Sequence, residues 1–341
     1  MKPRILTIDP NNIDIGLIKQ AAEAIHNRGL VAFPTETVYG LGANALDSRA
    51  VTGIFEAKKR PLDDPLILHI SKIDDLFLLA KNVPPEAEKL VNRFWPGPLT
   101  VVLEKTDMVS DIISTGLETV AVRMPSNPIA KKLIELSDVP IAAPSANLFG
   151  KPSPTSAKHV MDDLKGRIDI ILDGGPTEIG VESTVIEFVE GRSIILRPGG
   201  VEVDLIKEIA GDVEIASEGD HTIKSPGKYP QHYSPNAKVI LVEKGPQQVD
   251  ELLSQVKRLT SEGHKAGILA SQGHEEYYKT FNVKVLGPGE NGEICASRLF
   301  HLLREFDSEG VDIIAAEEIN EEGLGLAVMN RLRKAAGPDP E

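Results

Sequence analysis

The sequence predicts an α/β protein of two domains, a larger one with a twisted mixed sheet and flanking helices, and a smaller three-layer one. The chain has 341 residues, and a domain takes about 150. Apolar runs of strand length alternate with stretches of helical periodicity. From Gly211 to Pro235 the chain is polar, carries several Gly and Pro residues and shows no sustained apolar period, which is typical of a linker. We therefore expect domains at residues 1–210 and 237–341, joined by a linker at 211–236.

The larger domain is expected to begin with a strand, a helix and a second strand. The helix covers about Ile13–Asn27, because its apolar residues form one stripe and Gly29 is placed to end it. Asp47 can cap a helix that reaches Lys58 and ends before Pro61. The strands are irregularly spaced, which favours a mixed sheet, because a regular doubly wound fold needs a helix between every pair of strands. The expected strands are Ile5–Ile8, Leu30–Phe33, Leu66–Ile70, Leu99–Leu103, Val120–Arg123, Ile141–Ala143, Ile168–Leu172, Val185–Phe188 and Ile194–Arg197.

The smaller domain shows strict alternation of strands and helices after Ala237. Such alternation favours a parallel sheet covered by helices, a Rossmann-like arrangement. The expected strands are Val239–Val242, Ala266–Ala270, Val283–Leu286 and Val311–Ala316, and the expected helices are Gln247–Ser261, a short one near Glu275, Glu293–Asp307 and Leu326–Lys334.

Composition excludes several classes of protein. Hydrophobic residues make up 41% of the chain, enough for a buried core and too many for a disordered chain. The only cysteine is Cys295, which excludes internal disulfides and Cys-rich zinc modules. No stretch of about 18 apolar residues occurs, so we expect a soluble, cytoplasmic protein without membrane contact. The net charge of −14 argues against nucleic-acid binding except through a local patch or a released product.

Polar side chains follow a buried strand in the segment Pro34–Gly40. Its hydroxyls and the Glu36 carboxylate are placed to contact a small polar ligand. A turn whose side chains bond to their own backbone explains the same residues.

Three consecutive cations, Lys58, Lys59 and Arg60, end the second expected helix. They can complement the helix dipole, or Lys58 and Arg60 can clamp a triphosphate. His69 follows in an apolar strand, where a histidine is either a satisfied core residue or a ligand contact.

Arg123 alternates with apolar residues in an expected strand, where a cation is costly to bury without an anionic partner. Either it pairs with an internal carboxylate or it holds a ligand carboxylate, and the alternation leaves both open.

A later strand ends in Ser145-x-Asn147, which presents a hydroxyl and an amide on one side. No Gly-x-Ser-x-Gly elbow surrounds Ser145, so neutral donors for a nucleotide phosphate are favoured over a nucleophilic serine.

Together these segments resemble a known family, the YrdC-like domain, in its two-domain form, the threonylcarbamoyl-AMP synthases. The matching segments cover essentially the whole chain. They are Pro34-Thr35-Glu36-Thr37-Val38-Tyr39-Gly40-Leu41, Lys58-x-Arg60, Trp95–Thr100, Val122–Pro125, Ala143–Asn147, Glu182-Ser183-Thr184, Pro226-Gly227 with His232–Pro235, and Met329–Ala335.

The resemblance implies a nucleotidyltransferase that combines L-threonine, bicarbonate and ATP into threonylcarbamoyl-AMP and pyrophosphate, for threonylcarbamoyl-adenosine in tRNA. It further implies Mg²⁺ entering with ATP, no metal site built by the protein, no stable tRNA binding, and a downstream tRNA threonylcarbamoyl transferase as recipient of the product. Carried over by matching position, the implied residues fall into three sets. The catalytic set is Lys58, Arg60, Ser145 and Asn147; the threonine set is Thr37, His69, Arg123, Ala143 and Ser183; the ATP set is Arg60, Asp64, Thr119, Ser145, Ser153, Arg197 and Tyr233.

One residue departs from the family pattern. Asparagine often stands where this chain has Asp64, and a carboxylate cannot donate a hydrogen bond to phosphate. Asp64 is therefore a doubtful direct contact to ATP and instead favours a magnesium ion.

Two other functions compete with the synthase. The first is an RNA-binding module of the same fold without synthase activity, supported by the Lys58–Arg60 cluster and opposed by the acidic composition. The second is a dinucleotide site, because Gly287–Gly292 satisfies Gly-x-Gly-x-x-Gly and Asp312 follows at a suitable distance.

The linker and the acidic residues near the C-terminus carry two further expectations. Residues Pro226–Pro235 are expected to act as a lid that excludes water from the adenylate. The acidic residues Glu317, Glu318, Glu321 and Glu322 are expected to form a solvated face.

Overall fold

The computed structural model describes residues 2–217, 229 and 232–337, which belong to two compact units. The first unit consists of Met1–Phe149, Ser153–Glu178 and Glu182–Lys228. The second consists of Gly150–Pro152, Ile179–Val181 and Tyr229–Glu341. Two short pieces that precede residue 182 are thus part of the second unit.

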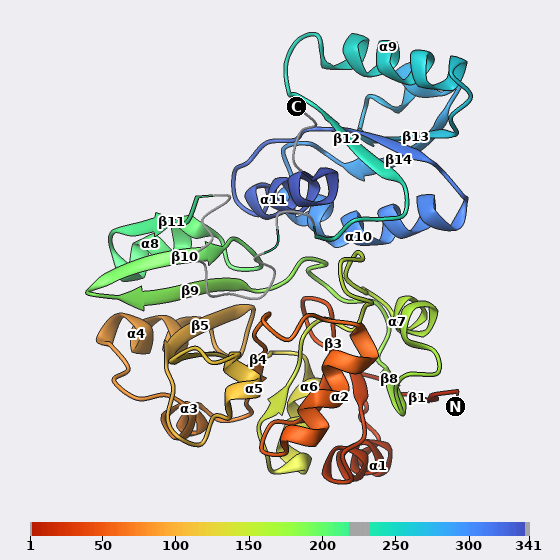
Figure 1. Ribbon diagram of the computed structural model, residues 1–341. Helices are drawn as coiled ribbons and strands as arrows, with labels where there is room; N and C mark the ends of the chain where they lie inside the picture. Colours follow the sequence, from red (N-terminus) through yellow and green to blue (C-terminus); the bar gives the residue numbers. More distant parts are fainter. Residues whose placement is uncertain (1, 218–228, 230–231, 338–341) are drawn as a thin grey trace. The chain divides into compact units, whose positions relative to one another are not determined.

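The first unit is built on a mixed sheet that has eleven strands among the described residues (Figure 1). Their order is β1-β8-β2-β3-β7-β4-β6-β5-β9-β10-β11, with both parallel and antiparallel neighbours. The mixed sheet predicted from the irregular strand spacing is therefore confirmed. The strands are β1 (Arg4–Thr7), β2 (Val31–Pro34), β3 (Tyr39–Asn44), β4 (Ile67–His69), β5 (Leu99–Glu104), β6 (Thr119–Arg123), β7 (Ile141–Ala142), β8 (Ile170–Asp173), β9 (Thr184–Val189), β10 (Arg192–Arg197) and β11 (Val213–Ile215).

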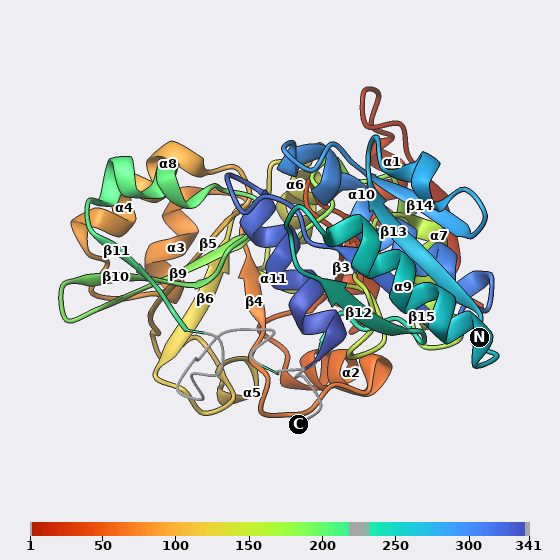
Figure 2. The same ribbon diagram turned by 90° about the horizontal axis from the view of Figure 1, so that it is seen from above.

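Two pairs of helices pack on different parts of this sheet, and α2 and α7 pack against β3 and β8. Helices α1 and α6 pack together and, with strands β1, β2 and β8, enclose an apolar core that includes Ile18, Val31 and Ile170. Helices α4 and α8 pack against each other beside β5 and β11 (Figure 2). The helices are α1 (Ile15–His26), α2 (Ser48–Lys58), α3 (Leu76–Leu79), α4 (Pro85–Phe94), α5 (Asp111–Ser114), α6 (Pro128–Ser137), α7 (Ala157–Leu164) and α8 (Val203–Ala210), with a 3₁₀ turn at Ile73–Asp75.

Local sequence explains where α2 begins and ends. The Asp47 carboxylate caps its N-terminus by accepting from Arg49 N (2.9 Å) and Ala50 N (3.3 Å). The helix ends at Lys58, before Pro61, as predicted. Strand β3 was not predicted, because its sequence Tyr-Gly-Leu-Gly-Ala-Asn has two glycines and follows a polar turn. It forms an antiparallel hairpin with β2 and also pairs with the distant strand β7.

The predicted linker contains part of the first sheet. Strand β11 lies within residues 211–236 and pairs in parallel with β10, so the sheet extends beyond residue 210. Farther along, Ser234 N donates to Gly150 O at 2.7 Å and Lys151 Nζ bonds to the Asn236 side chain, all within the second unit. Of the predicted lid Pro226–Pro235, residues 226–228 and 230–231 lie outside the described residues.

The second unit is the predicted small parallel domain. Its sheet has the order β12-β15-β13-β14, and all described pairings are parallel. Figure 1 shows α9 on one side of this sheet and α10 with α11 on the other. Among the described residues, no helix is long and apolar enough to cross a membrane. The elements are β12 (Lys238–Val242), α9 (Gln248–Ser261), β13 (Ala266–Ser271), a 3₁₀ helix η2 (Glu275–Tyr278), β14 (Asn282–Gly287), α10 (Gly292–Ser308), β15 (Ile313–Glu317) and α11 (Gly325–Ala336).

Candidate active site

Strand register in the first unit brings several of the predicted site residues to one edge of the sheet. His69 ends β4 and pairs with Arg123, which ends β6. Thr100, near the start of β5, pairs with Arg123 from the other side. Ser183 directly precedes β9, whose start lies beside that of β5, and Arg197 ends β10. Residues far apart in sequence, from 69 to 197, are therefore neighbours.

Arg123 is buried at the centre of this group. Its Nη2 donates to Glu36 Oε1 at 2.6 Å and to Thr37 Oγ1 at 2.9 Å. The sequence left open whether Arg123 pairs with an internal carboxylate, and the structure shows that it does. Its Nε is also buried and has no hydrogen-bond partner among the described residues. Because an unsatisfied buried donor is costly, this N–H points to a ligand acceptor.

His69 is a neutral imidazole in this environment. Burial, with the adjacent Arg123 guanidinium as second cause, lowers the pKa of His69 to about 3. Its Nδ1 lies 3.3 Å from Ile67 O, and its ring meets the edge of Phe33 with 6.2 Å between centroids. The side chain therefore brings no charge to the group and can exchange hydrogen bonds with a polar ligand.

Ser183 and Arg197 are linked directly. Arg197 Nη2 donates to Ser183 O (3.0 Å) and Ser183 Oγ (3.2 Å), and Ser183 Oγ lies 2.8 Å from Thr100 Oγ1. The loop after Arg197 packs tightly here, because a Cβ on Gly199 would lie 2.3 Å from Glu182 O. Only glycine fits at that position, and its close approach holds the backbone at Ser183 in place.

Lys58, Ser145 and Asn147 form a second group. Lys58 ends α2 and is buried, and its Nζ donates to Ser145 O (2.5 Å) and Asn147 O (2.6 Å). These bonds tie the end of α2 to the segment after β7. The structure thus brings together three of the four residues of the predicted catalytic set.

Arg60, the fourth, pairs with Asp64 instead. Arg60 Nη2 lies 2.9 Å from Asp64 Oδ2, and the guanidinium also donates to Asp64 O (3.0 Å) and Pro65 O (2.8 Å). Asp64 is fully buried. No group of three or more His, Cys, Asp or Glu side chains in the described part of the chain could hold a metal ion. The surroundings of Asp64 therefore favour a role as the ion-pair partner of Arg60 over a role as a metal ligand.

Three other predicted residues lie less centrally in the first unit. Ser153 Oγ donates to the buried Glu182 carboxylate. Ala143 is buried, and its backbone N donates to Ile67 O at 2.9 Å. Thr119 is half-buried at the start of β6, the opposite end from Arg123.

Tyr233 belongs to the second unit. It has a left-handed backbone conformation (φ 60°) and is buried. Its ring lies 5.5 Å from that of Phe300 and 4.1 Å from that of His232, between centroids, and the Arg331 guanidinium carbon lies 5.3 Å from its centroid. The expected contact of Tyr233 with ATP stays a prediction.

Two residues of the site were missed in the sequence. Glu36 was noted as a carboxylate near a strand end but not as the partner of Arg123, and Thr100 was noted only inside a longer motif. Both contacts join residues more than 80 positions apart, 87 for Glu36–Arg123 and 83 for Thr100–Ser183. The signal that could have found Glu36 is the need of a buried arginine for an anion.

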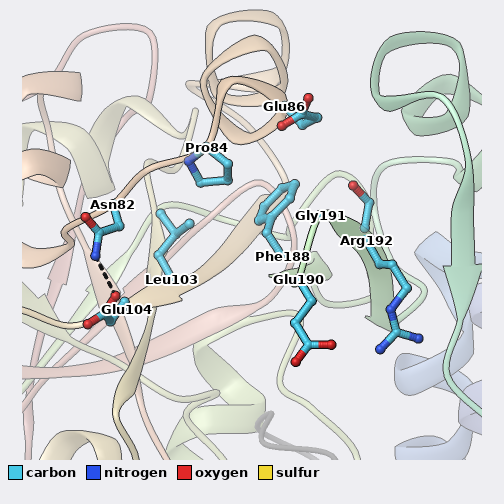
Figure 3. A pocket seen from close by; sticks show the side chains of 10 residues that line it. Asn82, Pro84, Glu86, Leu103, Glu104, Phe188, Glu190, Gly191 and Arg192 are labelled. Carbon is cyan, nitrogen blue, oxygen red and sulfur yellow. Dashed lines mark hydrogen bonds between the residues drawn. The ribbon is translucent and has the colours of Figure 1, made fainter.

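A pocket of about 230 Å³ lies elsewhere in the first unit. Figure 3 shows Phe188 and Leu103 there, between the carboxylates of Glu86, Glu104 and Glu190. Asn82 Nδ2 donates to Glu104 Oε2 at 2.7 Å. None of the predicted site residues lines this pocket. The others lining it are Pro84, Gly191, Arg192 and Ser193.

The second unit has a buried polar cluster of its own around Glu317. This carboxylate accepts hydrogen bonds from Ser271 N (2.7 Å), His274 Nδ1 (2.9 Å) and the Tyr278 hydroxyl. Glu317 is 1% exposed, so its predicted place on a solvated face is wrong. As the last residue of a central strand, it points into the unit, whereas Glu321 and Glu322 are exposed.

The dinucleotide alternative does not match the second unit. The loop at Gly287–Gly292 follows the carboxyl end of β14. Asp312 precedes β15 at its amino end, where its carboxylate accepts from Lys265 N at 2.8 Å. The acidic residue that should meet the ribose therefore lies at the wrong edge of the sheet.

Comparisons with known proteins identify the family of the chain. Residues 23–199 match the family model Sua5_yciO_yrdC, described as telomere recombination, and residues 201–337 match the model Sua5_C, described as the C-terminal domain of threonylcarbamoyl-AMP synthase. The chain is 52% identical to the threonylcarbamoyl-AMP synthase of Pyrococcus abyssi, covering 94% of each chain. It is 46% identical to that of Bacillus subtilis, covering 94% of this chain and 93% of that one. The crystal structure of P. abyssi Sua5 complexed with L-threonine is 50% identical, with a TM-score of 0.92 and 97% of each chain covered. The chain therefore belongs to the Sua5/YrdC family of threonylcarbamoyl-AMP synthases.

Proposed function

We propose that the chain makes threonylcarbamoyl-AMP from L-threonine, bicarbonate and ATP and releases pyrophosphate. The synthase activity of its relatives, and the L-threonine in the P. abyssi complex, support this proposal over an RNA-binding module. The observation that carries it is the buried guanidinium of Arg123, whose Nε has no partner among the described residues, beside the neutral His69. This arrangement suits an amino acid, because the guanidinium takes the carboxylate and the imidazole adds no charge.

The threonine site is proposed around Arg123. Its guanidinium holds the carboxylate through charge-assisted hydrogen bonds, which are strong in a buried site. Hydroxyl and imidazole groups beside it recognise the rest of the molecule. The residues proposed to line the site are Thr37, His69, Arg123, Ala143 and Ser183.

The ATP site is proposed along the cations and neutral donors of the first unit. Lys58 and Arg60 neutralise phosphate charge, while Ser145 and Asn147 supply neutral donors. Arg197 of the proposed ATP set is linked by hydrogen bonds to Ser183 of the proposed threonine set, which supports neighbouring sites for the two substrates. The remaining proposed ATP residues are Asp64, Thr119, Ser153 and Tyr233, with Asp64 acting through Arg60.

The chemistry needs positioning rather than a protein nucleophile. The uncharged amine of threonine takes up carbon dioxide to form a carbamate. A carbamate oxygen then attacks the α-phosphorus of ATP, the bond from that phosphorus to the bridging oxygen breaks, and pyrophosphate leaves. Buried cations stabilise the charge that builds up on the phosphate oxygens in the transition state.

Several wider features form part of the same proposal. Mg²⁺ enters with ATP, where it offsets part of the triphosphate charge. The protein works in the cytoplasm, and a tRNA threonylcarbamoyl transferase takes up the product. The catalytic activity is assigned to the first unit, which includes strand β11 beyond residue 210, and residues 237–341 belong to the second unit.

Pyrophosphate release tests the proposal directly. The protein is incubated with ATP, bicarbonate and each amino acid in turn, and pyrophosphate is measured. Release with threonine that depends on bicarbonate is expected. Release without bicarbonate indicates an ordinary amino-acid adenylating enzyme, and salt-sensitive RNA binding without release supports the RNA-binding alternative.

A further inference from the structure

Glu36 joins two separate segments of the site. It lies in the turn between β2 and β3 and is only 4% exposed. One of its oxygens, Oε1, accepts from Arg123 Nη2 at 2.6 Å, and the other, Oε2, accepts from Ser126 N at 3.1 Å. The carboxylate therefore holds both the end of β6 and the segment that follows it.

Only a carboxylate can make both contacts. Each of its oxygens accepts, and both partners here are donors. A glutamine in the same place has one acceptor oxygen and one NH₂ group, so either Arg123 or Ser126 N would face a second donor. The two contacts therefore require both the negative charge and the two acceptor oxygens of a carboxylate at position 36.

These contacts determine which donors of Arg123 are left for a ligand. Nη2 has two hydrogens, and Glu36 and Thr37 take both. Nε and Nη1 make no hydrogen bond to any described residue. The guanidinium is therefore fixed at one nitrogen and keeps its other N–H groups for an incoming acceptor.

We propose that Glu36 is a positioning residue that fixes the Arg123 guanidinium so that Nε and Nη1 are directed to the carboxylate of the amino acid. This inference rests on the proposed function. Two effects of Glu36 oppose each other, because its negative charge repels a second carboxylate while its hydrogen bonds orient the guanidinium. The orienting effect of the hydrogen bonds dominates. Without Glu36 the Arg123 guanidinium, which is about 95% buried, would have no partner for its charge and almost none for its donors. It would therefore leave this position.

The substitution Glu36→Gln tests the proposal. Steady-state pyrophosphate release gives KM for threonine and for ATP separately. We expect the threonine KM to rise about tenfold, with the ATP KM and kcat within about twofold of wild type. A matched control is Glu104→Gln, because Glu104 is another carboxylate with two donors, the side chains of Lys81 (2.9 Å) and Asn82 (2.7 Å), away from the site. The control should leave both KM values unchanged.

A double-mutant cycle shows whether Glu36 acts through Arg123. In the background Arg123→Lys, whose ammonium cannot make the same paired contacts, Glu36→Gln should change the threonine KM by less than about twofold. A further tenfold rise there would mean that Glu36 acts independently of Arg123, and the proposal would be wrong. Where Glu36→Gln does not fold, judged by thermal melting, Glu36→Asp replaces it, since the shorter acid keeps the charge but cannot reach both donors. An unchanged threonine KM in Glu36→Asp would then overturn the proposal.

The outcomes separate this inference from the proposed function. If the wild-type protein releases pyrophosphate with threonine but Glu36→Gln keeps the wild-type threonine KM, the positioning role is wrong and the function stands. Equal increases in both KM values also overturn it, because they indicate a structural role. If the wild-type protein shows no threonine-dependent release, both the function and the role of Glu36 fall.

Discussion

The two units bury charge in different ways. In the first unit, Arg123 is held through Nη2, while its Nε is buried without a partner among the described residues. In the second unit, the Glu317 carboxylate accepts from three donors of its own unit. Both charges lie at the end of a strand, and both are almost fully buried. The difference indicates that a buried charge marks a ligand site when its own unit leaves part of it unsatisfied, and a structural anchor when it does not.

The same difference separates the effects of mutation. Removing the charge of Arg123 should mainly cost activity, because a substrate is proposed to take its unpaired donor. Removing the charge of Glu317 should mainly cost stability, because its partners are internal. Four substitutions at buried groups of the two units sharpen this comparison.

The largest expected effect is that of Lys58→Ala on activity. Lys58 Nζ holds Ser145 O and Asn147 O, and the substitution removes both contacts together with a charge proposed to face phosphate. We expect kcat/KM for pyrophosphate release to fall by about a hundredfold or more. Lys59→Ala is the matched control, because Lys59 is the next residue and is exposed. Equal losses in the two variants would mean that general charge, rather than the buried cation, supports activity.

The next effect is that of Glu317→Ala on the second unit. Ser271 N, His274 and Tyr278 would lose their common acceptor inside the unit. We expect the free energy of unfolding of this unit to fall by about 3 kcal/mol. Hydrogen exchange of α10 peptides measures it, because these peptides report the second unit alone. Glu276→Ala, at a side chain that is 81% exposed, should change the exchange little.

A smaller loss for Glu317→Ala, below about 1 kcal/mol, would contradict the comparison. It would mean that this carboxylate is not a structural anchor and that its burial needs another explanation. Activity of the folded variant at low temperature is expected to stay near that of wild type.

The third effect is the pH dependence of stability that His69 causes. The pKa of His69 is lowered to about 3 in the folded protein and is about 6.5 in the unfolded chain. Below about pH 6.5 the unfolded chain binds a proton that the folded state does not, so stability falls as the pH falls. Between about pH 7 and about pH 5 this contributes a loss of about 2 kcal/mol.

Urea unfolding followed by Trp95 fluorescence measures this loss, because Trp95 is the only tryptophan and lies in the first unit. His69→Gln should remove about 2 kcal/mol of the difference between the two pH values. The exposed His26 offers a control, and His26→Gln should keep the wild-type difference. If His69→Gln keeps the wild-type change in the free energy of unfolding between the two pH values, then His69 is not held neutral by burial.

Much of the fold follows from local sequence patterns, while the ion pairs do not. Apolar runs predicted nine strands of the first unit because most of them are buried, although β1 is mostly exposed. Strand β3 was missed because its two glycines resemble a loop, and because one of its two partners, β7, comes from a distant segment. The alternation around Arg123 predicted a buried cation, but its partner lies 87 residues away and no spacing rule connects them. The position of Glu317 was predicted wrongly for a related reason. A group of acidic residues is typical of an exposed face, but Glu317 is the last residue of the buried strand β15.

The site shows the same division between chemistry and geometry. For the Lys58–Arg60 cations, the residues alone left both a helix-dipole role and a triphosphate clamp open, and the family resemblance favoured the clamp. Which of them carry internal partners could be learned only from the fold, as the pairs Arg60–Asp64 and Arg123–Glu36 demonstrate. That information decides which positive charge remains for a substrate.

The smallest expected effect is that of Tyr278→Phe, and it is the most direct comparison within the second unit. Burial and the adjacent Glu317 raise the pKa of Tyr278, so its hydroxyl stays protonated and keeps donating to the carboxylate. Without it Glu317 retains two of its three donors, and the free energy of unfolding should fall by about 1 kcal/mol, less than for Glu317→Ala. Tyr277→Phe is the matched control, because this neighbouring ring is 61% exposed and should cost less than about 0.5 kcal/mol. Hydrogen exchange of α10 distinguishes the two variants, and an equal loss in both would show that the Glu317 cluster depends on aromatic packing rather than on its hydrogen bonds.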